Sequence, residues 1–294
     1  MVDFSLYNPV TGSRNTVIPN YLTAGCFDRY GCRCMLGFGY DRTSDDYKIF
    51  YAMTTSSQPS VQSWIYSLKH NSWRRIIQPP PPLPIPLPFP HPRTKMVYYD
   101  NGLHWLVWDF NTNASYIFRF DLATEEYHQV EQPYYDDDDT FHVLAYRRRE
   151  LLVLTELRGC LHLVEYTTSP STRYASSWSK ESEEKEVYYM RMWVMKNNYD
   201  GGSLNRSWVK LIDCLSLIKQ VVSRVYTYTP PLPCAYSENG KEILIVLGER
   251  VFVKYDFSRG KLQSVKLCGL PNDWKYTYGR DFISWTSSFV SPSS

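Results

Sequence analysis

Short runs of alternating apolar and polar residues, separated by polar turns, fill most of the chain. Residues 65–76 are typical: they read IYSLKHNSWRRI, where an apolar run enters a turn of Lys, His and Asn and a second run leaves it. Alternation with a period of two is typical of a strand with one buried face, and a polar turn between two such runs indicates a hairpin. The pattern therefore predicts an all-β chain built from antiparallel hairpins.

The same hairpin recurs along the chain. Four stretches align without a gap and read LYNPVTGSRNTV, IYSLKHNSWRRI, RFDLATEEYHQV and KYDFSRGKLQSV. Their shared anchor is an aromatic residue, namely Tyr7, Tyr66, Phe120 or Tyr255. Seven residues after the anchor stand Arg14, Trp73, Tyr127 and Leu262, and ten residues after it stand Val17, Ile76, Val130 and Val265. A fifth, divergent copy is predicted in MWVMKNNYDGGSLNRSWVKLI, with an inserted loop between Met195 and Trp208.

A second hairpin lies upstream in each repeat. Two of its turns contain Asn-Gly, at 101–102 and 239–240, and a third contains Arg158 and Gly159. Asn-Gly is a strong hairpin signal because both central residues of a type I′ turn have positive φ. Two hairpins give four strands, and a period of roughly 50–60 residues is close to kelch-type spacing. We therefore predict a β-propeller of about five four-stranded, kelch-like blades, forming a single domain over residues 1–294.

The C-terminal segment FISWTSSFV, residues 282–290, carries bulky groups on both of its alternating faces. Such a strand is expected to pack between two blades. An open blade edge exposes unpaired backbone groups. We therefore predict that this segment pairs with the first blade and closes the ring.

The stretch GFGYDRTSDD at 37–46 resembles a phosphate loop only superficially, because it lacks the third glycine of G-x-G-x-x-G and a following Lys-Ser/Thr pair. We interpret it as the first strand and turn of the second blade. Glycine within a strand permits close approach of a neighbouring backbone. Because the first strands of blades line the central channel of a propeller, Gly37 and Gly39 are predicted to let neighbouring backbones approach closely there. The acidic turn with Asp41, Asp45 and Asp46 is predicted to be solvated.

Composition indicates which partners and which cellular compartment to expect. The net charge of +2 and pI of about 8.1 provide no strong basic field, so nucleic acid is not an expected partner. Seven cysteines are scattered without framework or zinc spacing, which favours reduced thiols and a cytoplasmic or nuclear location. No apolar run approaches membrane-spanning length, so no membrane association is expected.

The sequence offers no motif for catalysis or for a bound ion. The six histidines are isolated, and no G-x-S-x-G elbow is present. The run Asp136–Asp139 lacks the glycine of a calcium loop. Some propellers are glycosidases with two carboxylates in the channel, but the predicted inner strands here are mostly apolar. We expect no catalytic residues, no metal site and no cofactor.

Six motifs, in order and spacing, are similar to those of the plant F-box-associated domain: GFGYDRTSDDYKIF, IYSLKHNSWRRI, GLHWLVW, FRFDLATEEYHQV, MWVMKN with SWVKL, and FVKYDFSRGKLQSVKLCGLPN. This family includes S-locus and defence-related F-box proteins. The resemblance implies a propeller that recruits the substrate of an SCF-type (cullin-RING) ubiquitin ligase, while an F-box binds the Skp-type adaptor. A propeller glycoside hydrolase and a non-catalytic kelch-like scaffold are the alternatives.

One feature departs from the family: no helical F-box of roughly 45 residues precedes Asp3, and the first strands of blade one are missing as well. We therefore expect adaptor binding only through an F-box that this chain lacks. The chain alone is expected to be monomeric and to bind a target protein.

The predicted binding surface lies on the long loops between hairpins. Long irregular loops on a rigid scaffold often carry recognition, and aromatic residues anchor interfaces. The loops around 134–139, 167–186 and 269–279 supply the candidates Tyr134, Tyr135, Tyr174, Trp178, Trp274, Tyr276 and Tyr278. The proline-rich segment 79–92 is predicted to be an exposed polyproline II loop, with docking of an aromatic groove as its alternative role.

Overall fold

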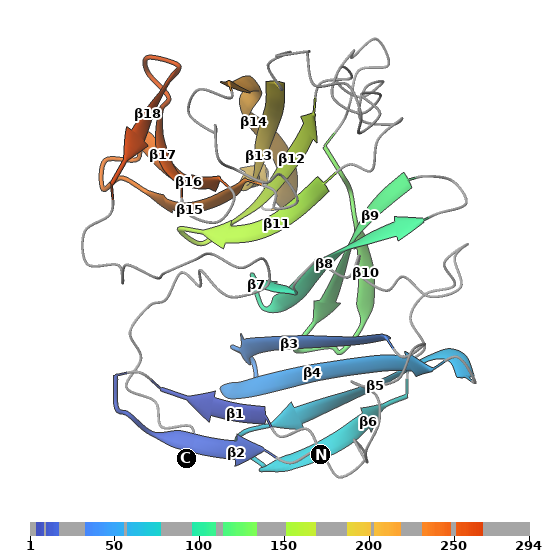
Figure 1. Ribbon diagram of the computed structural model, residues 1–294. Helices are drawn as coiled ribbons and strands as arrows, with labels where there is room; N and C mark the ends of the chain where they lie inside the picture. The colour runs from blue at the N-terminus through green and yellow to red at the C-terminus, as the bar shows by residue number, and fades with distance from the viewer. Residues whose placement is uncertain are drawn as a thin grey trace, which may run out of the picture. The chain divides into compact units, whose positions relative to one another are not determined.

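The computed structural model describes residues 4–8, 10–17, 33–55, 58–77, 96–109, 114–133, 151–168, 187–200, 203–218, 231–247 and 251–266. Every helix or strand assigned in these ranges is a β-strand (Figure 1). The chain divides into two compact units, residues 1–131 with 285–294, and residues 132–284. Within the described ranges, no helix has the length and apolar character needed to span a membrane.

The first unit contains three antiparallel sheets. The smallest pairs β1 (Phe4–Tyr7) with β2 (Arg14–Val17). The next comprises β3 (Arg33–Asp41), β4 (Asp46–Thr55), β5 (Gln58–Ser67) and β6 (Ser72–Ile76). The third comprises β7 (Val97–Tyr99), β8 (Gly102–Asp109), β9 (Ala114–Asp121) and β10 (Tyr127–Val130). Both larger sheets are meanders, in which each strand pairs with the next one along the chain.

The second unit contains two more four-stranded meanders. One comprises β11 (Leu151–Leu157), β12 (Cys160–Thr168), β13 (Val187–Asp200) and β14 (Ser203–Ile218). The other comprises β15 (Leu232–Tyr236), β16 (Glu242–Leu247), β17 (Val251–Asp256) and β18 (Lys261–Val265). The predicted all-β architecture of four-stranded blades is confirmed. The predicted closing segment, residues 282–290, lies outside the described residues.

Strand register explains the spacing of the sequence repeat. Each anchor lies directly opposite the residue seven positions later, in the pairs Tyr7–Arg14, Tyr66–Trp73, Phe120–Tyr127 and Tyr255–Leu262. In the divergent copy Met195 lies directly opposite Trp208, thirteen positions later, so six extra residues separate the paired positions.

The prediction of an inserted loop between Met195 and Trp208 is wrong. Pairing continues from Met195–Trp208 to Asp200–Ser203, so the insertion lengthens both strands of the hairpin. The reason is that residues were added in matched numbers on the two sides of the turn. Each added backbone group then finds a partner across the ladder and needs no loop.

One kind of turn closes the second hairpin in four sheets. The residue after each anchor accepts a backbone N–H bond with its side-chain oxygen, at Asn8, Ser67, Asp121 and Asp256. The residue five positions after each anchor has a positive φ, at Gly12 (71°), Asn71 (49°), Glu125 (60°) and Gly260 (61°). Short polar side chains and tolerance of positive φ are local properties of the sequence. The repeat therefore encodes its own turn.

The upstream turns follow the type I′ prediction only in part. At 239–240 only Gly240 has a positive φ (70°), so the predicted pair of positive φ angles is not formed there. Arg158 and Gly159 both have positive φ, as a type I′ turn requires. In the β7–β8 hairpin, however, the positive φ angles belong to Asp100 (46°) and Asn101 (58°), and Gly102 already pairs with the last residue of β7. The turn thus lies one residue earlier than the Asn-Gly pair indicated, since Asp and Asn also tolerate this region.

Each unit has its own core between two neighbouring sheets. In the first unit, aromatic residues of β4, β8 and β9 form the centre, with Phe50, Trp105, Phe118 and Phe120 fully or almost fully buried. In the second unit the corresponding core is aliphatic and thioether-rich, with Val164, Met190, Met192, Ile243 and Ile245. In both units two meanders thus pack face to face, but the side chains that fill the core differ.

The glycines of β3 permit this close packing, but the groups that approach them are side chains and not the backbones that were predicted. A Cβ added at Gly37 would lie 2.7 Å from Cδ1 of Leu103 and 2.9 Å from Sδ of Met96. A Cβ added at Gly39 would lie 2.5 Å from the Tyr98 ring and 2.8 Å from Cδ1 of Leu122. Side chains of the next sheet therefore occupy the space that any other residue would need.

Candidate functional site

All seven predicted partner-binding residues lie outside the described residues: Tyr134, Tyr135, Tyr174, Trp178, Trp274, Tyr276 and Tyr278. The proline-rich segment 79–92 and the acidic run Asp136–Asp139 also lie outside them. Their roles stay predictions. The described residues instead define the hairpin turns and the polar groups that hold neighbouring sheets together, and these show what chemistry the rigid part of the chain supports.

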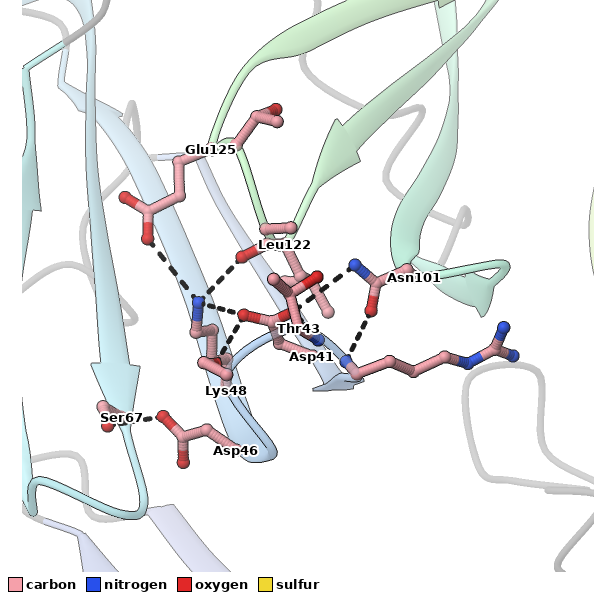
Figure 2. Close-up of polar contacts among 12 residues, drawn as sticks. Asp41, Thr43, Asp46, Lys48, Ser67, Asn101, Leu122 and Glu125 are labelled. Carbon is pink, nitrogen blue, oxygen red and sulfur yellow. Dashed lines mark hydrogen bonds and ion pairs between the residues drawn. The ribbon is translucent and has the colours of Figure 1, made fainter.

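A buried ammonium connects two sheets of the first unit. Lys48, on β4, donates from Nζ to Oδ2 of Asp41 at 2.7 Å and to the carbonyl of Leu122 at 2.8 Å. The carboxylate of Glu125 lies 3.8 Å from the same nitrogen. Figure 2 shows the ammonium between these oxygens, with Asp41 on its own sheet and the other two groups on the β9–β10 turn. The cation thus balances carboxylates from both sheets.

Asp41 is a structural ion, which corrects the prediction that the acidic turn is solvated. Its side chain is almost fully buried, and so is that of Asp46. Burial alone would raise the pKa of the Asp41 carboxyl, but hydrogen bonds from Lys48, Ser44 and the backbone N–H of Thr43 outweigh it and hold the pKa at about 2. The turn is polar because its carboxylates bind neighbouring groups. The local sequence alone does not distinguish a buried, hydrogen-bonded carboxylate from a solvated one.

Asp46 and Asn101 complete the polar contacts around this turn. Asp46 accepts hydrogen bonds from the hydroxyl of Ser67 and the backbone N–H of Lys69, which ties the first hairpin of the sheet to the second. The side-chain oxygen of Asn101 accepts from the backbone N–H of Arg42 at 2.8 Å, and its backbone carbonyl accepts from the N–H of Leu122. The turns of two sheets are therefore fastened to each other (Figure 2).

Glu125 occupies an unusual backbone position. It is the residue five positions after an anchor, where two other copies have glycine and one has asparagine, and its φ is 60°. A residue with a side chain of this size is uncommon at positive φ. Here the conformation directs the carboxylate to Lys48 and to Arg74 of β6. The inter-sheet ion contacts therefore accompany a backbone conformation that glutamate rarely adopts.

The second unit fastens its turns with an arginine. Arg158, the first residue of the β11–β12 turn, donates from Nη2 to the carbonyls of Ser237 and Glu238 at 2.6 and 2.9 Å. Its guanidinium also lies 5.7 Å from the centre of the Tyr236 ring. Arg42 occupies the same place in the first unit, after β3. In both units, the first turn of one sheet is bonded to the first turn of the next.

His162 is buried between the same two sheets. Its Nδ1 lies 3.0 Å from the carbonyl of Cys160, which can only accept, so Nδ1 carries the proton and Nε2 accepts from the Tyr236 hydroxyl at 2.9 Å. Burial lowers the pKa of His162 to about 4, and burial raises the pKa of Tyr236 to about 12. Both ring nitrogens are used in hydrogen bonds, so the imidazole serves packing.

These groups are poorly suited to acid–base chemistry. A general acid of a glycosidase needs a carboxyl whose pKa is raised. The pKa of Asp41, Asp121 and Asp256 is instead lowered by hydrogen bonds and neighbouring cations. Across the described ranges, no three His, Cys, Asp or Glu side chains gather as metal ligands would. What the polar residues do is hold the sheets and turns in place.

Two curated relatives from Arabidopsis thaliana are similar to the chain. One is F-box protein CPR1, 24% identical over 291 residues, which covers 92% of this chain and 61% of the relative. The other is an F-box/kelch-repeat protein, 26% identical over 136 residues, which covers 46% of this chain and 33% of the relative. The chain thus spans less than two thirds of the length of either protein.

Two solved structures are distantly similar to the chain. A chain from a study of two prolyl endopeptidases aligns with a TM-score of 0.30 and 9% identity, covering 87% of this chain and 44% of that one. An oligogalacturonate lyase from Vibrio parahaemolyticus aligns with a TM-score of 0.23 and 7% identity, covering 90% of this chain and 84% of that one. Similarity at this level carries no argument about chemistry.

The family comparison covers nearly the whole chain. Residues 3–276 match the F-box associated beta propeller domain. The match includes all five described sheets, and four of them are the antiparallel four-stranded meanders expected of propeller blades. The chain belongs to the F-box associated β-propeller domain family.

Proposed function

We propose that this chain is the substrate-recognition propeller of an SCF-type (cullin-RING) ubiquitin ligase receptor, and that it binds a target protein without catalysing a reaction itself. The observation that carries the proposal is the family match over residues 3–276. The names of the two relatives, both F-box proteins, support it. Adaptor binding, in this proposal, belongs to an F-box and not to the propeller.

The described chemistry is consistent with a binding scaffold. Neighbouring turns are bonded through Asn101 in the first unit and Arg158 in the second, and the carboxylates around Lys48 are already neutralised. A scaffold that is ordered before binding loses less conformational entropy when a partner arrives. The longer segments between hairpins are then free to vary in sequence, which is where recognition residues are usually found.

The proposed contact residues are the seven aromatic side chains of the long segments, and the proposed location is the cytoplasm or nucleus. Aromatic residues anchor interfaces because they bury a large area while ordering few torsions. The chain by itself is proposed to be a monomer. Size-exclusion chromatography with light scattering tests that point directly.

Proximity labelling in plant cells, with and without a proteasome inhibitor, tests the function. A target should be labelled by the chain fused to a family F-box and should accumulate when the proteasome is inhibited. A variant with Tyr134, Trp178, Trp274 and Tyr276 replaced by alanine should stay folded and lose that labelling. The matched control replaces Thr124 and Arg259, exposed residues of two hairpin turns, with alanine and should keep it.

Three outcomes would change the proposal. If labelled proteins bind but never change in abundance with the inhibitor, the chain is a kelch-like scaffold. If the aromatic variant keeps its partners and the turn variant loses them, recognition uses the turn face. A direct complex of micromolar or tighter affinity between residues 1–294 alone and a Skp-type adaptor would show that adaptor binding does not need the F-box.

A further inference from the structure

The β13–β14 hairpin extends beyond the rest of its sheet. Pairing of β12 with β13 stops at His162–Val194, and from Met195 to Asp200 the only strand that pairs with β13 in the described part of the chain is β14. Residues 195–200 and 203–208 thus form a two-stranded ribbon. At about 3.4 Å per residue, its strands continue for about 20 Å past the edge of β12.

The outer strand of this ribbon is a long sheet edge. β14 has 16 residues, whereas the outer strands β2, β6, β10 and β18 of the other sheets have four or five. Among the described strands, none pairs with the outer edge of β14. Register shifts of the kind that discourage edge pairing occur opposite Met190–Trp193, but the pairs of residues 203–210 follow without a shift. A regular backbone edge is therefore open to another strand.

One face of that edge has an ordered pattern of side chains. Arg206, Trp208 and Lys210 pair in unbroken register with alternate residues of β13, so they lie on the same face of the ribbon. Lys210 is exposed, and Arg206 and Trp208 are partly exposed. Two cations four positions apart thus flank an indole along the open edge.

The hairpin concentrates positive charge. Residues 196–210 contain three cations, Lys196, Arg206 and Lys210, and one carboxylate, Asp200, so this stretch alone has the same net charge as the whole chain, +2. Lys210 also forms an ion pair of 2.8 Å with Asp213, whose side chain is 74% exposed. A pair this exposed contributes little stability, so it competes weakly with a second carboxylate. The charge favours an acidic partner.

The same pattern disfavours a second copy of this chain as the occupant. If two copies paired antiparallel with Trp208 on the symmetry axis, Arg206 of one copy would lie opposite Lys210 of the other, and this would happen twice. Like charges directly opposite each other destabilise a pair of strands. A strand with carboxylates at both positions would instead form two opposite-charge pairs.

We propose that the outer edge of residues 203–210 binds an extended acidic segment of the target protein by strand addition. This inference rests on the proposed function, since the partner is the target. The segment would carry two carboxylates four positions apart, opposite Arg206 and Lys210, with an apolar residue midway between them, opposite Trp208. In strand addition the main-chain hydrogen bonds supply affinity and the alternating side chains supply specificity.

A titration with two synthetic peptides tests the charge pattern. The fluorescein-labelled peptide STEVIVETS should bind the full chain at least about tenfold more tightly than STKVIVKTS, because the second peptide places like charges opposite the edge. Arg206→Glu combined with Lys210→Glu should reverse this preference, which a misfolded chain would not do. Lys261→Glu with Lys266→Glu, at exposed cations in and beside the outer strand β18, is the matched control and should keep it.

N-methylation of the peptide tests the backbone contact. Only alternate residues of an added strand direct their N–H groups towards the edge. Methylation of both valines of STEVIVETS, or instead of its isoleucine and second glutamate, should abolish binding for one of the two sets and leave it for the other. Equal effects of the two sets, no binding of STEVIVETS, or an unchanged preference in the charge-reversed variant would each overturn the proposal.

Proximity labelling separates a failure at this edge from a failure of the proposed function. A target that the wild-type chain and the β18 control label, and the charge-reversed variant does not, would support the proposal. Equal labelling by the charge-reversed variant would overturn it and leave the proposed function standing. No labelled target at all would overturn the proposed function, whereas the peptide titration would still decide whether the edge binds an acidic strand.

Discussion

Two junctions between neighbouring sheets, one in each unit, achieve the same packing with different chemistry. The first-unit junction, between the β3–β6 and β7–β10 sheets, combines an aromatic core with a buried ammonium and two glycines. The second-unit junction, between the β11–β14 and β15–β18 sheets, combines an aliphatic core with a neutral histidine and an arginine bonded to carbonyls. Blade packing thus requires complementary surfaces but no particular residues.

The difference determines how each junction should fail. In the first-unit junction a full charge is buried, so removal of its partner leaves an uncompensated ion. In the second-unit junction the buried polar groups are neutral at pH 7, so they are sensitive to acid instead.

Lys48→Met should have the largest effect. It leaves Asp41 buried without its cation, which typically costs about 3–5 kcal/mol. Urea unfolding measures the loss. Lys254→Met, which breaks the more exposed pair with Glu242, is the matched control and should cost less than about 1 kcal/mol.

A double variant separates the cost of the uncompensated buried charge from the cost of lost packing. Asp41→Leu combined with Lys48→Met removes both charges and should recover a large part of the stability. If the double variant is as unstable as Lys48→Met alone, the ammonium contributes through packing and through its bond to Leu122, and the charge argument fails.

Acid should destabilise the second-unit junction through His162. Its pKa falls from an ordinary 6.5 to about 4 on folding, so the unfolded chain binds the proton more tightly. The stability is fully present above pH 6.5 and is lost as the pH falls towards 4, by about 3 kcal/mol in total.

His162→Asn keeps polarity but cannot titrate. The variant should be less stable at pH 7, and its stability should fall less steeply between pH 6.5 and 5. Asp41 titrates lower, with a pKa of about 2, so its contribution is lost only as the pH falls from about 4 to 2. Equal slopes for wild type and variant above pH 5 would show that His162 is not the titrating group.

Gly39→Ala should destabilise the first-unit junction by about 1–3 kcal/mol, the usual range for an overpacked core. The new Cβ would lie 2.5 Å from the Tyr98 ring, whose hydroxyl is bonded to the carbonyl of Tyr40 and cannot shift freely. Gly37→Ala is the matched comparison. It meets the ends of Leu103 and Met96, which can move, so thermal unfolding should show the smaller loss.

Arg158→Lys should have the smallest effect, below about 1 kcal/mol. Both bonds come from the single nitrogen Nη2, and a lysine ammonium also carries N–H groups for these carbonyls. Lysine loses mainly the planar guanidinium that lies over the Tyr236 ring. Arg158 is exposed, which limits the loss further. A loss as large as that of Lys48→Met would mean that the two junctions do not differ as described.

Local pattern was sufficient to predict the hairpins and the four-strand repeat. Each turn needs a residue after the anchor whose side chain accepts a hydrogen bond, and a residue five positions after the anchor that tolerates positive φ. Both requirements are met within a few residues and involve no distant contact. The extended β13–β14 hairpin was misread because an insertion in sequence does not reveal whether its two halves pair with each other.

The candidate binding surface could be proposed from the sequence only as a class of loops and residue types. Tyr134 and Trp274 were chosen because they are aromatic and stand in long connecting segments, and both lie outside the described residues. Their partners depend on how segments far apart in sequence assemble. A pattern of single residues does not contain that information.

What the sequence determined by itself is therefore the blade: alternation sets the faces of each strand, and turn residues set the pairing of neighbours. What only the tertiary structure decided is the role of individual polar residues between blades. Asp41 and Asp45 stand in one acidic turn, yet Asp41 is a buried ion and Asp45 is exposed. The physical reason is that burial and ion pairing depend on groups such as Lys48 and Leu122, and Leu122 belongs to another sheet, more than 70 residues away in the chain.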